Sequence, residues 1–274
     1  MIKHYTFSAR WRKKDTEYIE TFKTSRKIAQ GFCSFYVEEK DYQSIMKYYS
    51  KKDSLLNKTK PPEFSVRLVF VSFSKEELDD AKYYMLAATG APKGYPQPEQ
   101  GEHLKKTFSF DCGNYRTNRK QIAPFRIKKP KWSKNQVNFS LNWEWDFMFF
   151  KKEFYQEVFA PLGIKSKEVL QHSTGKPLED TVQLDIPVAE SSIYLEDSAF
   201  DIYEPRCGKK QYARQYLDFF PPFKKEFNFH ICYTQEEFDG GFKRIIISKE
   251  FCNLLTKHKI IKYISTHLIP MKSK

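Results

Sequence analysis

The chain has 274 residues, 17% of them aromatic, and an excess of lysine and arginine gives it a formal net charge of +13. That length and aromatic content are enough for one large domain or two modest ones with a real core, and they exclude a disordered chain. No apolar run approaches the roughly 18 residues of a membrane-spanning helix, and the first residues, MIKHYTFSARWRKK, lack the apolar stretch of a secretory signal.

A strand and a helix are expected first in chain order. Residues 64–73, FSVRLVFVSF, are mostly apolar over the length of a buried strand. The next four residues, SKEE, have the spacing of a capping box in which Ser74 caps a helix and Glu77 reaches back to it. The helix is expected to end at Gly90, with an inner face made of Leu78, Ala81, Tyr84, Met85 and Ala88.

A turn-rich connection follows this helix. The stretch APKGYPQPEQGE, at 91–102, is rich in proline and glycine, which favour extended or turning backbone over regular structure. We therefore place a boundary here and expect an N-terminal α/β segment over residues 1–94.

Two Cys-Gly pairs look like incomplete zinc knuckles. A zinc knuckle uses Cys-x-x-Cys-Gly, because two thiolates at this spacing grip one side of a tetrahedral ion. Cys112 and Cys207 each precede a glycine, but Ser109 and Glu204 stand where the first cysteine of each knuckle would be. We expect no metal and no other cofactor, with both turns kept as structural relics. The stretch HIC at 230–232, paired with Cys207, stays open as an alternative ligand set.

Basic and acidic residues are segregated along the chain. Residues 178–205 hold acids and no lysine or arginine, which suits a basic protein partner, although a solvated acidic loop is the simpler alternative. Its candidate partner-binding residues are Glu190, Glu196, Asp197 and Asp201. Residues 115–134 hold basic and aromatic residues and no acid, a pattern that suits nucleic acid or a merely solvated surface. The nucleic-acid candidates are Arg116, Arg119, Lys120, Arg126, Lys128 and Trp132.

Strands and short helices are expected in both halves of the remaining chain. In the first half, strict alternation over 139–149 predicts one half-buried strand, and apolar spacing predicts a short helix over 151–159. In the second half, residues 242–247 form a strand and Ser248 caps a short helix. The face of the first strand that we expect to be buried carries Phe139, Leu141, Trp143, Trp145, Phe147 and Phe149.

These two halves repeat the same order of features. Lys-Glu-Phe occurs at 152–154 and 249–251, each time after an apolar triplet, and the spacing from the Cys-Gly pair agrees to within two residues. A second turn-rich stretch, STGKPLED, lies between the copies. We expect an α+β fold with two related lobes, 95–177 and 178–274, each with mixed or antiparallel sheets and short helices.

No catalytic motif was found. The chain has no phosphate-binding loop, no paired-histidine metal motif and no nucleophile elbow, and its six histidines are dispersed. Five cysteines without tight spacing, together with the missing signal, favour free thiols in a reducing cytoplasm. We therefore expect a cytoplasmic protein that is not an enzyme.

The order of these features resembles the double-CXXCG motif family of bacterial, myxobacterial-type toxin immunity proteins. The resemblance covers residues from about 95 to 270. It rests on GYPQPE before the first Cys-Gly, the tryptophan-containing strand leading to PLGI, VQLDIPVAESSIY before the second Cys-Gly, and the closing FKRIIISKEFCNLLTKHKIIKYISTHLIP. Both knuckles of the family pattern are degenerate here, since each keeps only its second cysteine.

The resemblance implies a protein that binds a cognate toxin domain and occludes its active site. Its partner is then a protein, with no membrane and no nucleic acid involved. The alternative is a nucleic-acid-binding module that uses the basic and aromatic stretch 115–134.

Overall fold

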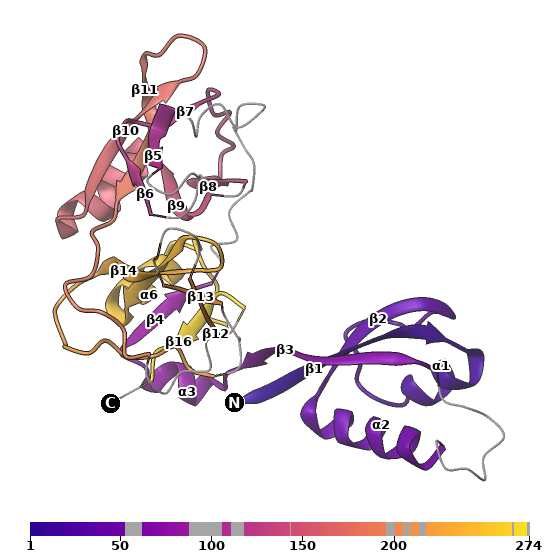
Figure 1. Cartoon of the computed structure of the whole chain (residues 1–274). Coiled ribbons are helices and arrows are strands. Elements are labelled where there is room, and N and C mark those ends of the chain that lie inside the picture. The colour runs from indigo at the N-terminus through magenta and orange to yellow at the C-terminus, as the bar shows by residue number, and fades with distance from the viewer. Residues whose placement is uncertain are drawn as a thin grey trace. The chain divides into compact units, whose positions relative to one another are not determined.

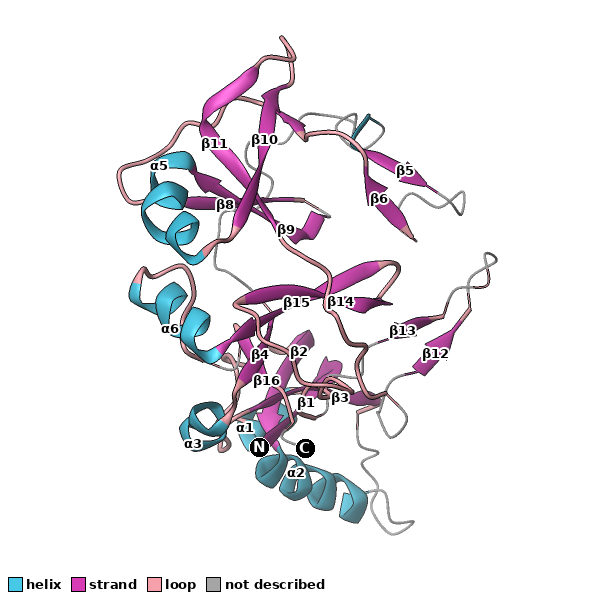
Figure 2. Ribbon diagram, turned by 90° about the vertical axis from the view of Figure 1, so that its left-hand side faces the viewer, coloured by secondary structure: helices cyan, strands magenta, loops and turns pink. Residues whose placement is uncertain are grey.

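A computed structural model of the chain describes residues 1–52, 62–87, 106–110, 118–142, 144–195, 201–204, 208, 210–213, 218–264 and 266–272. The fold is α+β, as the sequence predicts, with mixed and antiparallel sheets and few, short helices (Figures 1 and 2). The chain divides into two compact units. Unit 1 comprises residues 1–79 with 216–218, and unit 2 comprises residues 80–215 with 219–274.

Unit 1 is a three-stranded antiparallel sheet with helices on one side. The central strand β1 (Ile2–Trp11) pairs with β2 (Gly31–Glu38) and with β3 (Phe64–Ser72). Helix α1 (Lys13–Ile19) follows β1 directly, and helix α2 (Glu39–Lys52) follows β2.

The core of unit 1 is formed by those strand residues that point to one face of the sheet. Successive strand residues point to opposite faces, so Phe7 and Trp11 point to the same side as Phe35. There they pack against Ile45 and Tyr49 of α2, which lies along this side of the sheet in Figure 1. The indole N–H of Trp11 donates to the main-chain carbonyl of Cys33 at 2.8 Å, so this buried polar group is satisfied.

Unit 2 contains two larger sheets and a two-stranded ribbon. The five-stranded sheet has the order β7-β10-β11-β9-β8, the six-stranded sheet has the order β12-β13-β14-β15-β4-β16, and β5 pairs with β6. The strands are β4 (Tyr83–Leu86), β5 (Phe108–Phe110), β6 (Arg119–Gln121), β7 (Arg126–Ile127), β8 (Asn138–Leu141), β9 (Glu144–Lys151), β10 (Lys165–Gln171), β11 (Pro177–Asp185), β12 (Asp201–Tyr203), β13 (Gln211–Ala213), β14 (Ile231–Phe238), β15 (Phe242–Ser248) and β16 (Leu268–Pro270).

Each large sheet has a strand that runs directly into a helix. Strand β9 is followed by α5 (Lys152–Phe154), a π-helical turn (Tyr155–Phe159) and a 3₁₀ turn (Ala160–Leu162). Strand β15 is followed by α6 (Lys249–Lys257), and the Ser248 side chain accepts from the Phe251 N–H, which confirms the predicted cap. The two helical segments lie next to each other in Figure 2. Phe159 contacts Phe251, with ring centroids 5.5 Å apart.

The helix predicted up to Gly90 ends much earlier. The capping box is confirmed, because the Glu77 N–H donates to Ser74 Oγ at 3.2 Å and the Ser74 N–H donates to Glu77 Oε2 at 2.8 Å. Helix α3 (Lys75–Asp80) then stops, and β4 begins at Tyr83. The helical prediction over 81–87 is wrong because this apolar stretch is held between β15 and β16, where sheet pairing and burial outweigh the local helical spacing.

The single strand predicted over 139–149 is two strands, β8 and β9. Phe139, Leu141 and Phe149 are buried, as predicted. The prediction is wrong for Trp145, which is 50% exposed while Glu144 and Asp146 are buried. The reason is a buried arginine that pairs with both acids, described below. Residue 143 lies outside the described residues.

The structure divides the chain at places other than the expected boundaries. Strand β11 continues past residue 177 and pairs with β9 and β10 in the five-stranded sheet. Strand β4, inside the expected N-terminal segment 1–94, belongs to the six-stranded sheet of unit 2. No helix in the described part of the chain combines the length and apolar character needed to cross a membrane.

Candidate partner-binding site

A buried ion cluster lies at the centre of unit 2. The guanidinium of Arg119, on β6, bonds Glu144 at 2.5 Å and Asp146 at 2.6 Å, both on β9. The three side chains are 4%, 0% and 8% exposed, respectively. Burial of a charge is costly, and it is tolerated here because opposite charges and hydrogen bonds accompany it.

Aromatic rings complete the surroundings of this guanidinium. Its central carbon lies 4.6 Å from the ring centroid of Phe108, 5.1 Å from that of Phe147 and 5.5 Å from that of Phe242, within range of cation–π attraction. The Tyr233 hydroxyl donates to the main-chain carbonyl of Asp146, which joins β14 to β9. The cluster therefore connects strands of both large sheets.

Arg119 and Tyr233 keep their ordinary protonation at neutral pH. Burial alone lowers the pKa of Arg119, but Asp146 and Glu144 outweigh it, so the pKa lies above its ordinary value. Burial and the charge of Asp146 raise the pKa of Tyr233, so its hydroxyl stays protonated. Neither group suits proton transfer near pH 7, which favours a structural role over catalysis.

Beside this cluster, the two charge-segregated segments of the sequence come together. A cavity of about 260 Å³ is lined by Arg119 and Lys120 from the basic stretch and by Asp185 from the acidic one. Asp185 pairs with Lys167 at 2.8 Å, across the antiparallel pairing of β10 and β11. The acidic segment itself contains no lysine or arginine, but Asp185 gains a counter-charge from a neighbouring strand.

The two described acidic candidates for partner binding do not line this cavity. Glu190 is exposed in an irregular segment that also exposes Val188 and Tyr194. Asp201 is exposed on β12, beside the exposed Ile202. Glu196 and Asp197 lie outside the described residues.

The segment with Glu190 and Tyr194 is held against a loop rich in phenylalanine. The Tyr194 N–H donates to the Pro222 carbonyl, and the Lys224 N–H donates to the Ser192 carbonyl, both at 2.8 Å. An isolated β-bridge joins Ile193 to Phe223 between these two bonds. The backbone contacts fix the segment beside the loop without help from a full strand.

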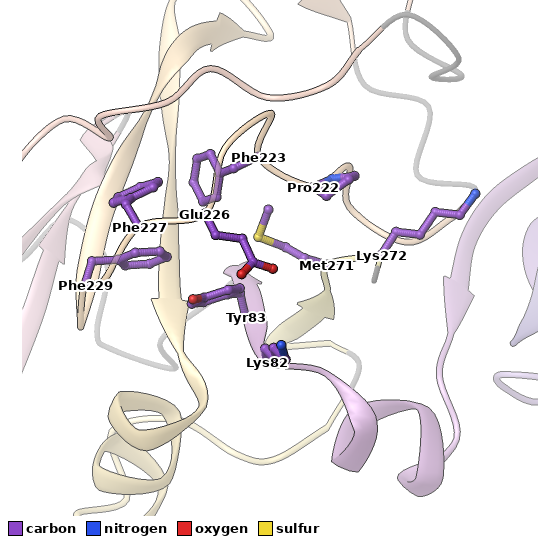
Figure 3. Close-up of a pocket in the computed structure, with 9 residues that line it drawn as sticks. All are labelled: Lys82, Tyr83, Pro222, Phe223, Glu226, Phe227, Phe229, Met271 and Lys272. Carbon is purple, nitrogen blue, oxygen red and sulfur yellow. The ribbon is translucent and has the colours of Figure 1, made fainter. Parts of the chain in front are cut away.

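This loop forms a pocket of about 140 Å³, which we call the aromatic pocket (Figure 3). Phe229 stacks on Tyr83 of β4 and on Phe227, with ring centroids 4.8 Å apart in each case. Phe223 meets Phe227 edge to face at 4.9 Å. The pocket is lined by Lys82, Tyr83, Pro222, Phe223, Glu226, Phe227, Phe229, Met271 and Lys272.

One carboxylate points into the aromatic pocket. In Figure 3 the Glu226 carboxylate lies between Tyr83 and Met271, whereas the ammonium of Lys272 points away. Among the described residues Glu226 makes no ion pair. Burial and the charge of Glu226 raise the pKa of Tyr83, so its phenol stays neutral. Aromatic rings beside a carboxylate suit a cationic side chain, above all an arginine, whose planar group stacks on rings and pairs with an acid.

The nucleic-acid candidates differ in their surroundings, because some lie in the interior of unit 2 and others on its surface. Arg119 is engaged in the buried cluster, and Trp132 packs on Phe139 in the core of the five-stranded sheet, with centroids 5.4 Å apart. Lys120 and Lys128 are exposed and Arg126 is half-buried. Arg116 lies outside the described residues. Arg119 and Trp132 are thus engaged in contacts inside unit 2.

The knuckle cysteines, Cys112 and Cys207, lie outside the described residues. Gly208 has the left-handed backbone, with φ of 69°, that a glycine adopts without strain. Of the alternative ligand set, Cys232 is buried and its pKa is raised by burial, so the thiol stays protonated and does not suit metal binding. The described residues include no group of three or more acids, histidines and cysteines placed to hold a metal ion.

Sequence reasoning missed the aromatic pocket. Its signal is the density of phenylalanine around one acid in PPFKKEFNF, at 221–229. Strand β4 supplies Tyr83, which is far from this loop in the sequence, so no local sequence pattern predicts that Tyr83 lines the pocket. No protein-family model, no curated protein and no solved structure matches this chain.

Proposed function

We propose that this chain is a cytoplasmic immunity protein, which binds a cognate bacterial toxin domain and occludes it without chemistry of its own. The aromatic pocket supports the proposal best. Tight protein complexes rely on a few anchors that fill buried pockets, and arginine and aromatic side chains are the commonest anchors. A basic side chain of the toxin, stacked on Phe229 and paired with Glu226, is such an anchor.

The surroundings of the pocket supply the other parts of an interface. Tyr194 exposes apolar surface close to the loop that carries the pocket, and Glu190 adds an acid. Lys224 and Lys225 on the same loop are exposed as well, so the surface is mixed in charge rather than uniformly acidic. A mixed surface around an aromatic centre favours a specific partner over a uniform polyelectrolyte.

The proposal is tested by protection of cells. The gene beside this chain's own gene is expected to encode a secreted protein with a toxic C-terminal domain. Expression of that domain in a heterologous host should arrest growth, and co-expression of this chain should restore it. A chain that fails to rescue growth and does not bind the purified domain contradicts the proposal.

Variants of the pocket locate the binding site. Glu226→Gln combined with Phe229→Ala removes the acid and one stacking ring, and should weaken toxin binding at least about 30-fold, the loss of a hot spot of about 2 kcal/mol. Glu168→Gln combined with Ile122→Ala is the matched control, since both residues are exposed in unit 2 away from the pocket. Equal affinity of the two double variants, measured by calorimetry, assigns binding to another surface.

A further inference from the structure

In the described part of unit 1, the helices pack on one side of the sheet and exposed aromatic and basic side chains lie on the other. Directly paired residues in an antiparallel sheet point to the same face. Phe32 pairs with Arg10, and Tyr36 pairs with Thr6, which in turn pairs with Arg67. These side chains point away from the core residues that contact α2. Phe32 is 74% exposed and Tyr36 is 42% exposed.

Aromatic rings on this side are already packed against one another. His4 stacks on Phe70 with centroids 4.3 Å apart, and Tyr36 meets Phe70 edge to face at 5.3 Å. The His4 Nε2 is 2.9 Å from Ser72 Oγ, which fixes the ring further. Burial lowers the pKa of His4 while Glu38 offsets part of this effect, so the ring is neutral and acts as a flat stacking surface. The rings are therefore fixed before any ligand arrives.

Positive charge accompanies these rings. Arg10 and Arg67 are exposed on the same side, and neither is in an ion pair within the described residues. The nearby acids are Glu38, which pairs with Lys40 at 3.3 Å, and Glu63, which comes just before β3. This side of the sheet is thus cationic and aromatic at once.

We propose that this side of the sheet binds single-stranded nucleic acid. Bases stack on Phe32 and Tyr36, and the guanidinium groups of Arg10 and Arg67 contact phosphates. A double helix keeps its bases stacked inside and offers no base face to these rings, so the strand must be single. An acidic protein surface would satisfy the arginines but would leave the exposed ring faces without a partner of matching shape. This site is separate from the aromatic pocket of unit 2 and does not depend on the proposed immunity function.

The proposal is tested on the full chain with fluorescein-labelled oligouridylate and oligothymidylate of about ten nucleotides, a typical length for one such surface. Fluorescence anisotropy should show binding that weakens with salt. Phe32→Ala and Tyr36→Ala should each raise Kd about tenfold or more, the loss of one stacked base. Arg10→Gln with Arg67→Gln should lower the slope of log K against log salt by about 0.7 per lost phosphate contact.

A matched charge control makes this test specific. Lys13→Gln with Lys14→Gln removes the same charge from exposed positions on α1, away from the open side of the sheet. An equal effect of the two double variants, or equal binding of a duplex of the same length, overturns the proposal. A dimer in sedimentation that Phe32→Ala dissociates also overturns it, because a second copy then occupies this side. All four exposed residues tolerate substitution without loss of the core, which circular dichroism checks.

Discussion

Arg119 is a charged residue in an almost fully buried environment. Its charge is removed from water, and two carboxylates and three aromatic rings replace the lost hydration. A buried ion pair of this kind gives little net stability compared with well-packed apolar residues, because the desolvation cost offsets the attraction. Its clearer effect is geometric, since it fixes β6 against β9, and Tyr233 extends the link to β14.

We expect Arg119→Met to destabilise unit 2 by about 3–5 kcal/mol, because it leaves two buried carboxylates without a counter-charge. Adding Glu144→Gln and Asp146→Asn should recover part of this loss. The measurement is urea denaturation followed by circular dichroism. Lys151→Met is the control, since its ion-pair partner Glu153 is 80% exposed, and its cost should stay below about 1 kcal/mol. Equal losses for the two variants would contradict the account of the cluster.

The pH dependence of unit 1 should come in part from His4. Its folded-state pKa is lowered, mainly by burial, so the unfolded chain binds a proton more readily. The contribution of neutral His4 to the free energy of unfolding is complete above the pKa of the unfolded chain, near 6.5. It is lost as the pH falls toward the lower pKa of the folded state. His4→Phe keeps the stacking and should flatten the decline in stability between about pH 7 and pH 5. An unchanged pH profile in denaturation titrations would exclude this role.

The irregular segment after β11 shows how an element without regular secondary structure can be held in place. Residues 191–194 hydrogen-bond to the loop 222–225 through backbone groups. The exposed side chains of this segment are therefore held in place before a partner binds, and binding costs little further conformational entropy. Of the acidic candidates, this segment carries Glu190, whereas Asp201 is on β12. Asp185, from the wider acidic stretch, lies on β11 and gains a counter-charge from Lys167.

Neutralising the four acidic candidates together should slow toxin association several-fold at low salt and leave thermal stability nearly unchanged. The substitutions are Glu190→Gln, Glu196→Gln, Asp197→Asn and Asp201→Asn. Charges at the rim of an interface act mainly on the association rate, and salt screens them. Stopped-flow measurements at low and high salt check this. An association rate that matches the wild type at low salt would show that the segment is only solvated.

At the scale of the whole molecule, the chain consists of two units with separate cores. Trp11 is central to the core of unit 1, and the Arg119 cluster is central to unit 2. Units with their own hydrophobic cores unfold as separate cooperative systems unless a large interface couples them.

We therefore expect two transitions in calorimetry. Trp11→Ala should lower the midpoint of one transition, because truncation of a buried tryptophan costs about 3–5 kcal/mol. Arg119→Met should lower the midpoint of the other. A single transition that both variants shift equally would show that the units unfold together.

Several local features could be predicted because their causes lie within a few residues. The capping box at Ser74 and Glu77 and the cap at Ser248 depend on side chains that reach backbone groups three positions away. The strands at 64–72 and 242–248 follow from apolar runs of strand length. The sequence by itself thus determined the α+β class, these caps and these two strands, while the immunity function stays a prediction.

The tertiary structure alone decided which residues are buried and which charges are paired. Tyr84 and Met85 have helical spacing but lie in a strand, because β15 and β16 from the far end of the chain supply their neighbours. The alternation at 144–149 placed Trp145 inside, yet Arg119 attracts Glu144 and Asp146 inward and leaves the tryptophan exposed. The aromatic pocket likewise needs Tyr83 beside Phe229. In each case the deciding partner is remote in sequence, and local periodicity contains no information about it.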